Sequence, residues 1–168
     1  MKLSRDEIKM LIRETIAPTF VPFGFMNPGV SMWRWREEFV DVLHFYMPSN
    51  TTDFAIELGF HPRKLSSTHP MPWDSIFRGR IQYLDKSICS GTFYKTQNTI
   101  EKEREMILII IPFVQENALA WWSAFSTIEK SLKLILNSGE FEQEKFGFSA
   151  KGSLAYVRNV TLLQSLRN

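Results

Sequence analysis

The 168-residue sequence predicts a single α+β domain spanning residues 1–168, in which an antiparallel sheet of four or five strands carries an N-terminal helix and three C-terminal helices packed on one face. Two observations predict this class. Strand-like alternation of apolar and polar residues follows one leading helix in the first half of the chain, whereas helical spacing dominates the second half. In addition, no linker divides the sequence, and its length suits one core.

The first element is predicted to be a helix that begins after Ser4. Glu7 follows three residues later, which is the spacing of a capping box. The next apolar residues share one helical face: Ile8, Leu11, Ile12 and Ile16. Pro18 and Gly24 then limit the helix.

Two antiparallel strands are predicted within residues 31–47, because this stretch is rich in aromatic and β-branched residues and is broken by Glu37-Glu38. With these glutamates in a tight hairpin, the predicted register pairs Trp35 with Val40, Trp33 with Val42, and, on the opposite side, Arg34 with Asp41. Residues 53–61 are predicted to form a third strand. One of its sides carries Phe54, Ile56, Leu58 and Phe60, and the other carries Ala55, Glu57, Gly59 and His61.

A long loop is predicted over residues 62–79, which contain three prolines and show neither a helical nor a strand period. Its two aromatic residues, Trp73 and Phe77, are expected to be exposed. Residues 80–84 are predicted as a fourth strand and residues 91–94 as a short fifth, with their register left open.

The second half begins with a predicted helix over residues 99–117, kinked near Pro112. The charged run from Glu101 to Glu105 is interpreted as a solvated helix start. An alternative for residues 106–111 is a buried strand, because three consecutive isoleucines favour β structure.

Two more helices are predicted after this one. Ser126 and Glu129 form a second capping-box pattern, which opens a helix that ends near Ser138. Residues 150–166 give the last helix, whose apolar side is predicted to carry Leu154, Val157, Val160, Thr161 and Leu163. Trp121, Trp122 and Phe125 are expected between two helices, either as core packing or as an exposed anchor for another protein.

Composition excludes several classes of function. Lys and Arg number 20 against 18 Asp and Glu, and this net charge of +2 argues against a nucleic-acid partner. The N-terminus carries charges where an export signal needs apolar residues, and the longest apolar run, residues 106–114, is too short to cross a membrane. Cys89 is the only cysteine, which suits a reducing compartment. We therefore expect a cytoplasmic protein with no membrane partner.

No motif for a metal or a cofactor is present. The three histidines, His44, His61 and His69, lack the spacing that brings two imidazoles to one metal from one helix. Neither a glycine-rich phosphate loop nor a Gly-x-Ser-x-Gly elbow occurs. The sequence therefore predicts no metal, no cofactor and no catalytic residue.

Short motifs occur in a fixed order along the chain: Ile16-Ala17-Pro18, Phe23-Gly24-Phe25, Trp33-Arg34, Leu58-Gly59-Phe60, Arg80-Ile81, and a bulky turn before a capped helix at residues 121–129. In this order they resemble an uncharacterised family of bacterial domains of unknown function. The resemblance implies a small α+β fold over nearly the whole chain and no assigned activity. The chain departs from the family at Gln82, where members carry glycine.

The predicted binding site combines a charged cluster on the polar side of the sheet with the end of the third strand and the long loop. It comprises Arg34, Asp41, Glu57, His61, Trp73 and Phe77. Charged side chains of this kind can orient a carboxylate or an amide. We therefore expect a noncatalytic binding domain that recognises a protein or a small ligand, by analogy with small immunity proteins that bind bacterial toxins.

Two alternatives stay open at this point. The first is an enzyme that uses His61 with Glu57 or Asp41 in acid/base chemistry on a small molecule. The second is self-association into a homodimer through a free sheet edge or an exposed tryptophan pair.

Overall fold

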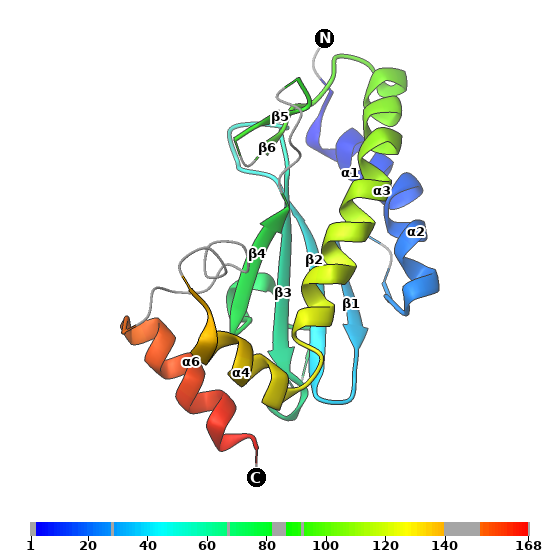
Figure 1. The fold of residues 1–168 in the computed structure, drawn as a ribbon. Coiled ribbons are helices and arrows are strands. Elements are labelled where there is room, and N and C mark those ends of the chain that lie inside the picture. The colour runs from blue at the N-terminus through cyan, green and yellow to red at the C-terminus, as the bar shows by residue number, and fades with distance from the viewer. Residues whose placement is uncertain are drawn as a thin grey trace.

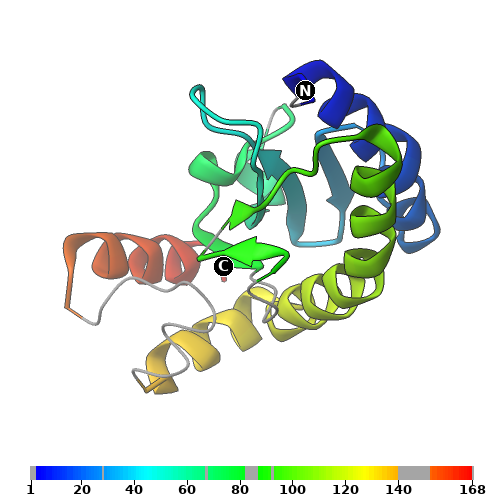
Figure 2. The ribbon, with the colours of Figure 1, turned by 90° about the horizontal axis from the view of Figure 1, so that it is seen from above.

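A computed structural model describes residues 3–27, 29–66, 68–81, 87–91, 93–139 and 152–167 of the chain. It confirms the α+β class, with a four-stranded antiparallel sheet, an N-terminal helix and three later helices. Helix α3 crosses one face of the sheet, and α4 and α6 lie at the end of the sheet where α3 ends (Figure 1). Helices α1 and α2 lie beside α3, as the view from above also shows (Figure 2). The helices are α1 (Arg5–Thr15), α2 (Ala17–Phe20), α3 (Ile100–Ala124), α4 (Ile128–Asn137) and α6 (Leu154–Ser165).

The N-terminal helix begins as its sequence predicts. The Glu7 amide donates to Ser4 Oγ over 3.3 Å, and the Ser4 amide donates to Glu7 Oε2 over 2.6 Å, which completes the capping box. The predicted apolar stripe is fully buried: Ile8, Leu11, Ile12 and Ile16. Pro18 lies in the first turn of α2, where a missing amide proton costs no hydrogen bond.

The sheet is an antiparallel meander in the order β1-β2-β3-β4. Its strands are β1 (Ser31–Trp35), β2 (Phe39–Tyr46), β3 (Ala55–Pro62) and β4 (Phe77–Ile81). The predicted hairpin register is confirmed, with Arg34 opposite Asp41, Trp33 opposite Val42 and Trp35 opposite Val40.

Aromatic side chains fill the layer between the sheet and α3. Phe60 on β3 packs against Phe125, which directly follows α3, with 4.4 Å between the ring centroids. The fully buried Trp122 of α3 donates from Nε1 to the Gly59 carbonyl oxygen of β3 over 2.9 Å. This bond gives the buried indole N–H the partner it needs and fixes α3 on the sheet.

The fourth strand begins earlier than the sequence indicates. Phe77 is the first residue of β4 and is 2% exposed, so its predicted position in an exposed loop is wrong. It packs on Phe60 and Phe125, and the burial of its ring stabilises this end of the sheet. Residues 82–84 of the predicted strand, with Gln82, lie outside the described residues. Instead of one fifth strand, a two-stranded ribbon pairs β5 (Cys89–Ser90) with β6 (Phe93–Tyr94).

Residues 100–124 form one continuous helix, which confirms the helical prediction over the strand alternative. The helix extends past residue 117 and includes Trp121 and Trp122, which are 7% and 0% exposed and serve as core residues. Glu103 is fully buried, so the prediction of a wholly solvated charged start is wrong at this position.

Helix α3 is long and apolar enough to cross a membrane by length and composition, with a mean hydropathy of 1.3 over 18 residues. Within the fold, 44% of that window is buried, and Trp121 and Trp122 pack in the domain core. A core helix buried by a sheet has the same composition, which explains the hydropathy without a bilayer.

Helix α4 is capped one residue later than predicted. Thr127 is the N-cap, and its hydroxyl oxygen accepts from the Lys130 amide over 3.1 Å. The Glu38 carboxylate accepts the Ile128 amide over 2.7 Å, which satisfies a second free amide of the helix start. The Ser126 hydroxyl is therefore not used for capping.

This assignment predicts that Thr127→Ala lowers the free energy of unfolding by about 1 kcal/mol, the usual cost of a lost N-cap. Ser126→Ala is the matched control, since it removes a hydroxyl next to the cap without removing a hydrogen bond, and its expected change is below about 0.5 kcal/mol. Urea unfolding followed by circular dichroism measures both. Equal losses in the two variants would show that the helix begins elsewhere.

Helix α6 presents a different face to the core from the one predicted. Val160 and Leu163 are buried as expected, but Leu154 is 91% and Val157 51% exposed. The buried polar residue Asn159 donates from Nδ2 to the Ile76 carbonyl over 2.7 Å. This bond attaches α6 beside β4. Residues 150 and 151 of the predicted helix lie outside the described residues.

Candidate functional site

The structure divides the predicted site between the two faces of the sheet. Side chains alternate along strands, and the register places Asp41 beside Phe60 rather than beside Glu57. Arg34 and Asp41 therefore lie on the face that α3 covers, and Glu57 lies on the opposite face. The expected cluster of Arg34, Asp41 and Glu57 on one surface is wrong, and two separate polar groups replace it.

The first group, the Asp41 cluster, consists of Arg34, Arg36 and Asp41. Asp41 is fully buried, and its two carboxylate oxygens accept from Arg34 Nε at 2.8 Å and from Arg36 Nη2 at 2.6 Å. Burial raises the pKa of Asp41, and the two guanidinium charges act in the opposite direction. The Arg34 guanidinium also lies over the Phe25 and Trp122 rings, 5.1 and 5.5 Å from their centroids.

The second group, the Glu57 cluster, crosses all four strands on the face opposite α3. One residue from each strand forms a row in register: Ser31, His44, Glu57 and Arg80. Glu57 is 2% exposed, and its Oε1 accepts from Arg80 Nε at 2.9 Å and from Arg80 Nη2 at 2.6 Å. Arg78, the fifth member, has Nη2 at 3.7 Å from the same oxygen.

Electrostatics make the Glu57 cluster positive. Burial lowers the pKa of His44, although the Glu57 carboxylate acts in the opposite direction, so the imidazole is neutral at pH 7. Its Nδ1 lies 2.8 Å from Ser31 Oγ. Two guanidiniums then face one carboxylate, and the side chain of Arg78 is 44% exposed.

Aromatic rings border the Glu57 cluster. Trp73 is 60% exposed, and its ring centroid lies 5.9 Å from that of His44. The Arg80 guanidinium lies 5.8 Å from the Tyr46 ring and 5.6 Å from the Phe93 ring. The predicted exposure of Trp73 is therefore found, and Phe77 belongs to the core instead.

His61 lies apart from both candidate carboxylates. Its Nδ1 lies 3.0 Å from the Asp74 backbone carbonyl oxygen, a contact with the loop rather than with an acid. Asp41 faces the other side of the sheet, and Glu57 is four residues away along β3, about 13 Å at the usual strand rise. The residues of the predicted acid/base pair are not brought together.

Several residues of these clusters were not identified from the sequence as site residues: Ser31, Arg36, His44, Arg78 and Arg80. A usable signal existed in residues 77–81, where apolar or small residues alternate with two arginines. The three prolines upstream favoured a loop instead, and the alternation was missed.

Metal binding and cysteine chemistry have little support in the parts of the chain that the structure describes. No group of three or more His, Cys, Asp or Glu there is placed to hold a metal ion. Cys89 is buried, and its thiol donates to the Gly91 carbonyl over 3.1 Å.

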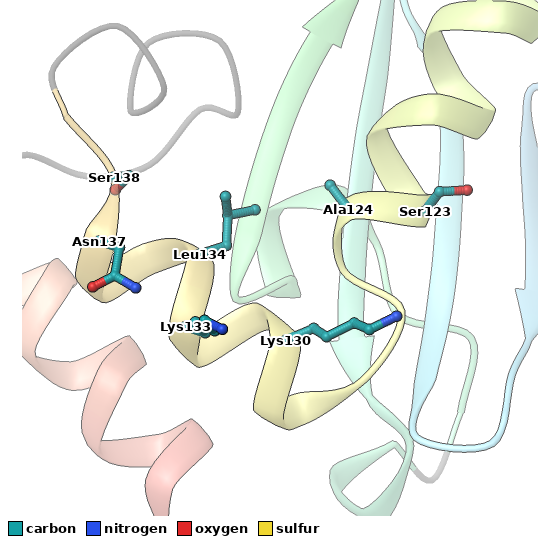
Figure 3. A pocket seen from close by; sticks show the side chains of 7 residues that line it. All are labelled: Ser123, Ala124, Lys130, Lys133, Leu134, Asn137 and Ser138. Atoms are coloured by element: carbon teal, nitrogen blue, oxygen red, sulfur yellow. The ribbon is translucent and has the colours of Figure 1, made fainter.

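An open cavity of about 490 Å³ lies between the end of α3 and α4, lined in part by Ala124, Lys133, Leu134 and Asn137 (Figure 3).

Comparison with known proteins adds no relative: no family model, no curated protein and no solved structure matches this chain. The resemblance to a bacterial family of unknown function therefore stays a prediction, and the function is argued from the two clusters.

Proposed function

We propose that the protein is a noncatalytic binding domain that recognises an acidic segment of a protein partner on the face opposite α3. The observation that carries the proposal is the position of the exposed Trp73 beside the positive Glu57 cluster, with Arg78 and Arg80. Trp and Arg are the residue types that most often dominate protein interfaces.

Glu57 supports binding by holding the arginines in place. A buried carboxylate is costly unless it is paired, and Arg80 supplies two hydrogen bonds to it. The pair leaves Arg80 with a fixed guanidinium beside two aromatic rings, so little side-chain entropy is lost on binding. Arg78 retains most of its donors for a partner carboxylate.

Trp73 is presented by a short, well-ordered turn. The Met71 amide donates to Asp74 Oδ2 over 2.9 Å, and the Asp74 amide donates back to the Met71 carbonyl over 2.9 Å. Pro72 restricts the same turn. An indole held in this way can bury a large area on a partner without first becoming ordered.

The same contacts argue against catalysis at this cluster. A carboxylate that orients a catalytic imidazole must hydrogen-bond to it, but Glu57 Oε1 accepts from Arg80. The Nδ1 atom of His44 faces the Ser31 hydroxyl, and the lowered pKa of His44 keeps the imidazole ring neutral. The arrangement suits recognition rather than proton transfer.

Selection of a random peptide library on the purified protein tests the proposal. We expect enrichment of peptides that combine Asp or Glu with an apolar residue. Trp73→Ala is expected to weaken a selected peptide about thirtyfold, as interface tryptophans do, and Arg78→Gln about tenfold. Fluorescence polarisation measures both affinities, and raising the salt concentration is expected to weaken binding.

Arg104→Gln is the matched control, because Arg104 is an exposed arginine of α3 whose side chain is 50% exposed. Its expected effect is less than about twofold. Enrichment of neutral or basic peptides, or equal losses for Arg78→Gln and Arg104→Gln, would refute the proposal.

A toxin-immunity role and a cytoplasmic location stay predictions. The predicted homodimer also stays a prediction, and light scattering at two concentrations tests it.

A further inference from the structure

A second charged feature lies on the other side of the molecule from the Glu57 cluster. An open cavity of about 550 Å³ separates the end of β1 from the turn between α3 and α4. The residues of its wall that matter here are Phe23, Arg34, Trp35, Arg36, Ser126 and Lys130. We name it the basic cavity. Its volume is in the range of sites for small molecules.

The charges of the basic cavity are unbalanced. Arg34, Arg36 and Lys130 are cationic, and the buried Asp41 behind them is shared by the two arginines. Lys130 has no carboxylate partner among the residues that the structure describes. The acidic residues of this end, Glu37 and Glu38, line a different cavity with Lys64. The basic cavity therefore attracts an anion.

Two buried polar atoms of the cavity residues have no hydrogen-bond partner: Arg36 Nε and Ser126 Oγ. A buried donor without an acceptor costs about 1–3 kcal/mol, so such atoms are rare unless a ligand or water satisfies them. Ser126 is free because Thr127 caps α4 in its place.

From these contacts we propose that the basic cavity binds the phosphoryl group of a small phosphate monoester. The donors available are the Arg36 Nε–H, the Lys130 ammonium and the hydroxyls of Ser126 and Ser123, which also lines the cavity. They come from different elements. A carboxylate has two oxygens and one charge, whereas a phosphoryl group has three oxygens and nearly two charges, which better matches four separate donors and an excess of cations.

Lys130 is placed to reach this ligand. Figure 3 shows its side chain extending away from Lys133, toward the side of α4 on which Ser123 lies. Both Lys130 and Ser123 line the basic cavity, whereas Lys133 lines only the neighbouring one. The two lysines of the same helix therefore differ in their access to the cavity.

The arginines are held ready for binding. Asp41 fixes both guanidiniums through bonds of 2.6 to 2.8 Å, and two aromatic rings support Arg34. Phe23, which is 41% exposed, supplies apolar wall for the organic part of the ester. A phosphate ester with a flat ring is therefore expected to bind more tightly than inorganic phosphate.

Calorimetric titration of the whole chain tests the inference with four probes: inorganic phosphate, ribose 5-phosphate, adenosine 5′-monophosphate and adenosine. We expect saturable binding of the two esters, weaker binding of inorganic phosphate and no binding of adenosine. Lys130→Gln and Ser126→Ala are each expected to weaken the esters about tenfold, a typical loss for a hydrogen bond to a charged group. Neither variant disturbs the Asp41 cluster.

Lys133→Gln is the matched control, since it removes the same charge from the same helix outside the basic cavity. Its expected effect is less than about twofold. In ¹H–¹⁵N spectra, the Arg36 Nε–H signal is expected to move downfield on addition of ester. Equal losses for the two lysine variants, tight binding of adenosine, or spectral shifts centred on Arg78 and Arg80 would each overturn the inference. Peptide binding at the Glu57 cluster is measured separately, with the Trp73→Ala and Arg78→Gln variants.

Discussion

Replacing Asp41 with alanine is expected to lower the free energy of unfolding by about 3–5 kcal/mol, the cost of breaking a buried ion pair by removing one partner. The carboxylate is fully buried, and it is the acceptor for Arg34 and Arg36, whose side chains are each 19% exposed. Without Asp41, two mostly buried guanidiniums lose their counter-charge. Urea unfolding at pH 7 measures the loss.

Asp6→Ala is the control for this prediction. The Asp6 carboxylate also forms an ion pair, 3.2 Å from Lys9 Nζ, but its side chain is 92% exposed. Exposed pairs contribute at most about 1 kcal/mol, so this variant is expected to unfold nearly as the wild type does. Similar stabilities for the two alanine variants would show that the Asp41 cluster is solvated in solution.

The second large effect concerns Glu103 and pH. Burial raises the pKa of this carboxyl to about 7 from its ordinary value of 4.5, and the nearby Asp53 acts in the same direction. Below about pH 4.5 the side chain is protonated in both the folded and the unfolded state. Between about 4.5 and 7 only the folded state keeps the proton, so stability falls as the pH rises. Above pH 7 the loss is complete, about 3 kcal/mol.

Glu103→Gln is expected to remove this dependence. The glutamine side-chain oxygen can still accept the Gln97 amide, which lies 2.6 Å from Glu103 Oε2 in the wild type, but it carries no charge. The stability of the variant relative to the wild type should therefore rise by about 3 kcal/mol between pH 4 and pH 8. Unfolding titrations across this range measure the difference, and a constant offset would contradict the buried acid.

Much of the fold could be predicted because its signals are local. The capping box at Ser4 and Glu7 needs only residues within one turn, and the structure confirms it. The β1–β2 register follows from a hairpin of known length, so Arg34 was correctly placed opposite Asp41. The cap of α4 lies at Thr127 although only Ser126 has a glutamate three residues later, because a hydroxyl can cap a helix without the second half of the capping box.

The candidate site was less predictable. Its residues lie on strands whose relative register depends on the segment between β2 and β3, residues 47–54, for which the pattern gives no rule. A shift of one residue exchanges the faces, which is why Glu57 was wrongly grouped with Arg34. The basic cavity was missed for a related reason, since Lys130 and Arg36 are 94 positions apart in sequence.

By itself, the sequence determined the α+β class, the hairpin and the alternating sides of the first three strands, because side-chain period and capping act over a few residues. The tertiary structure alone decided which sides face α3. A charged pair such as Arg34 and Asp41 can be buried when each charge satisfies the other, so polarity does not reveal which face is covered. The register between β2 and β3 placed Glu57 on the face opposite Arg34 and Asp41, which separated one predicted surface into two sites of different chemistry.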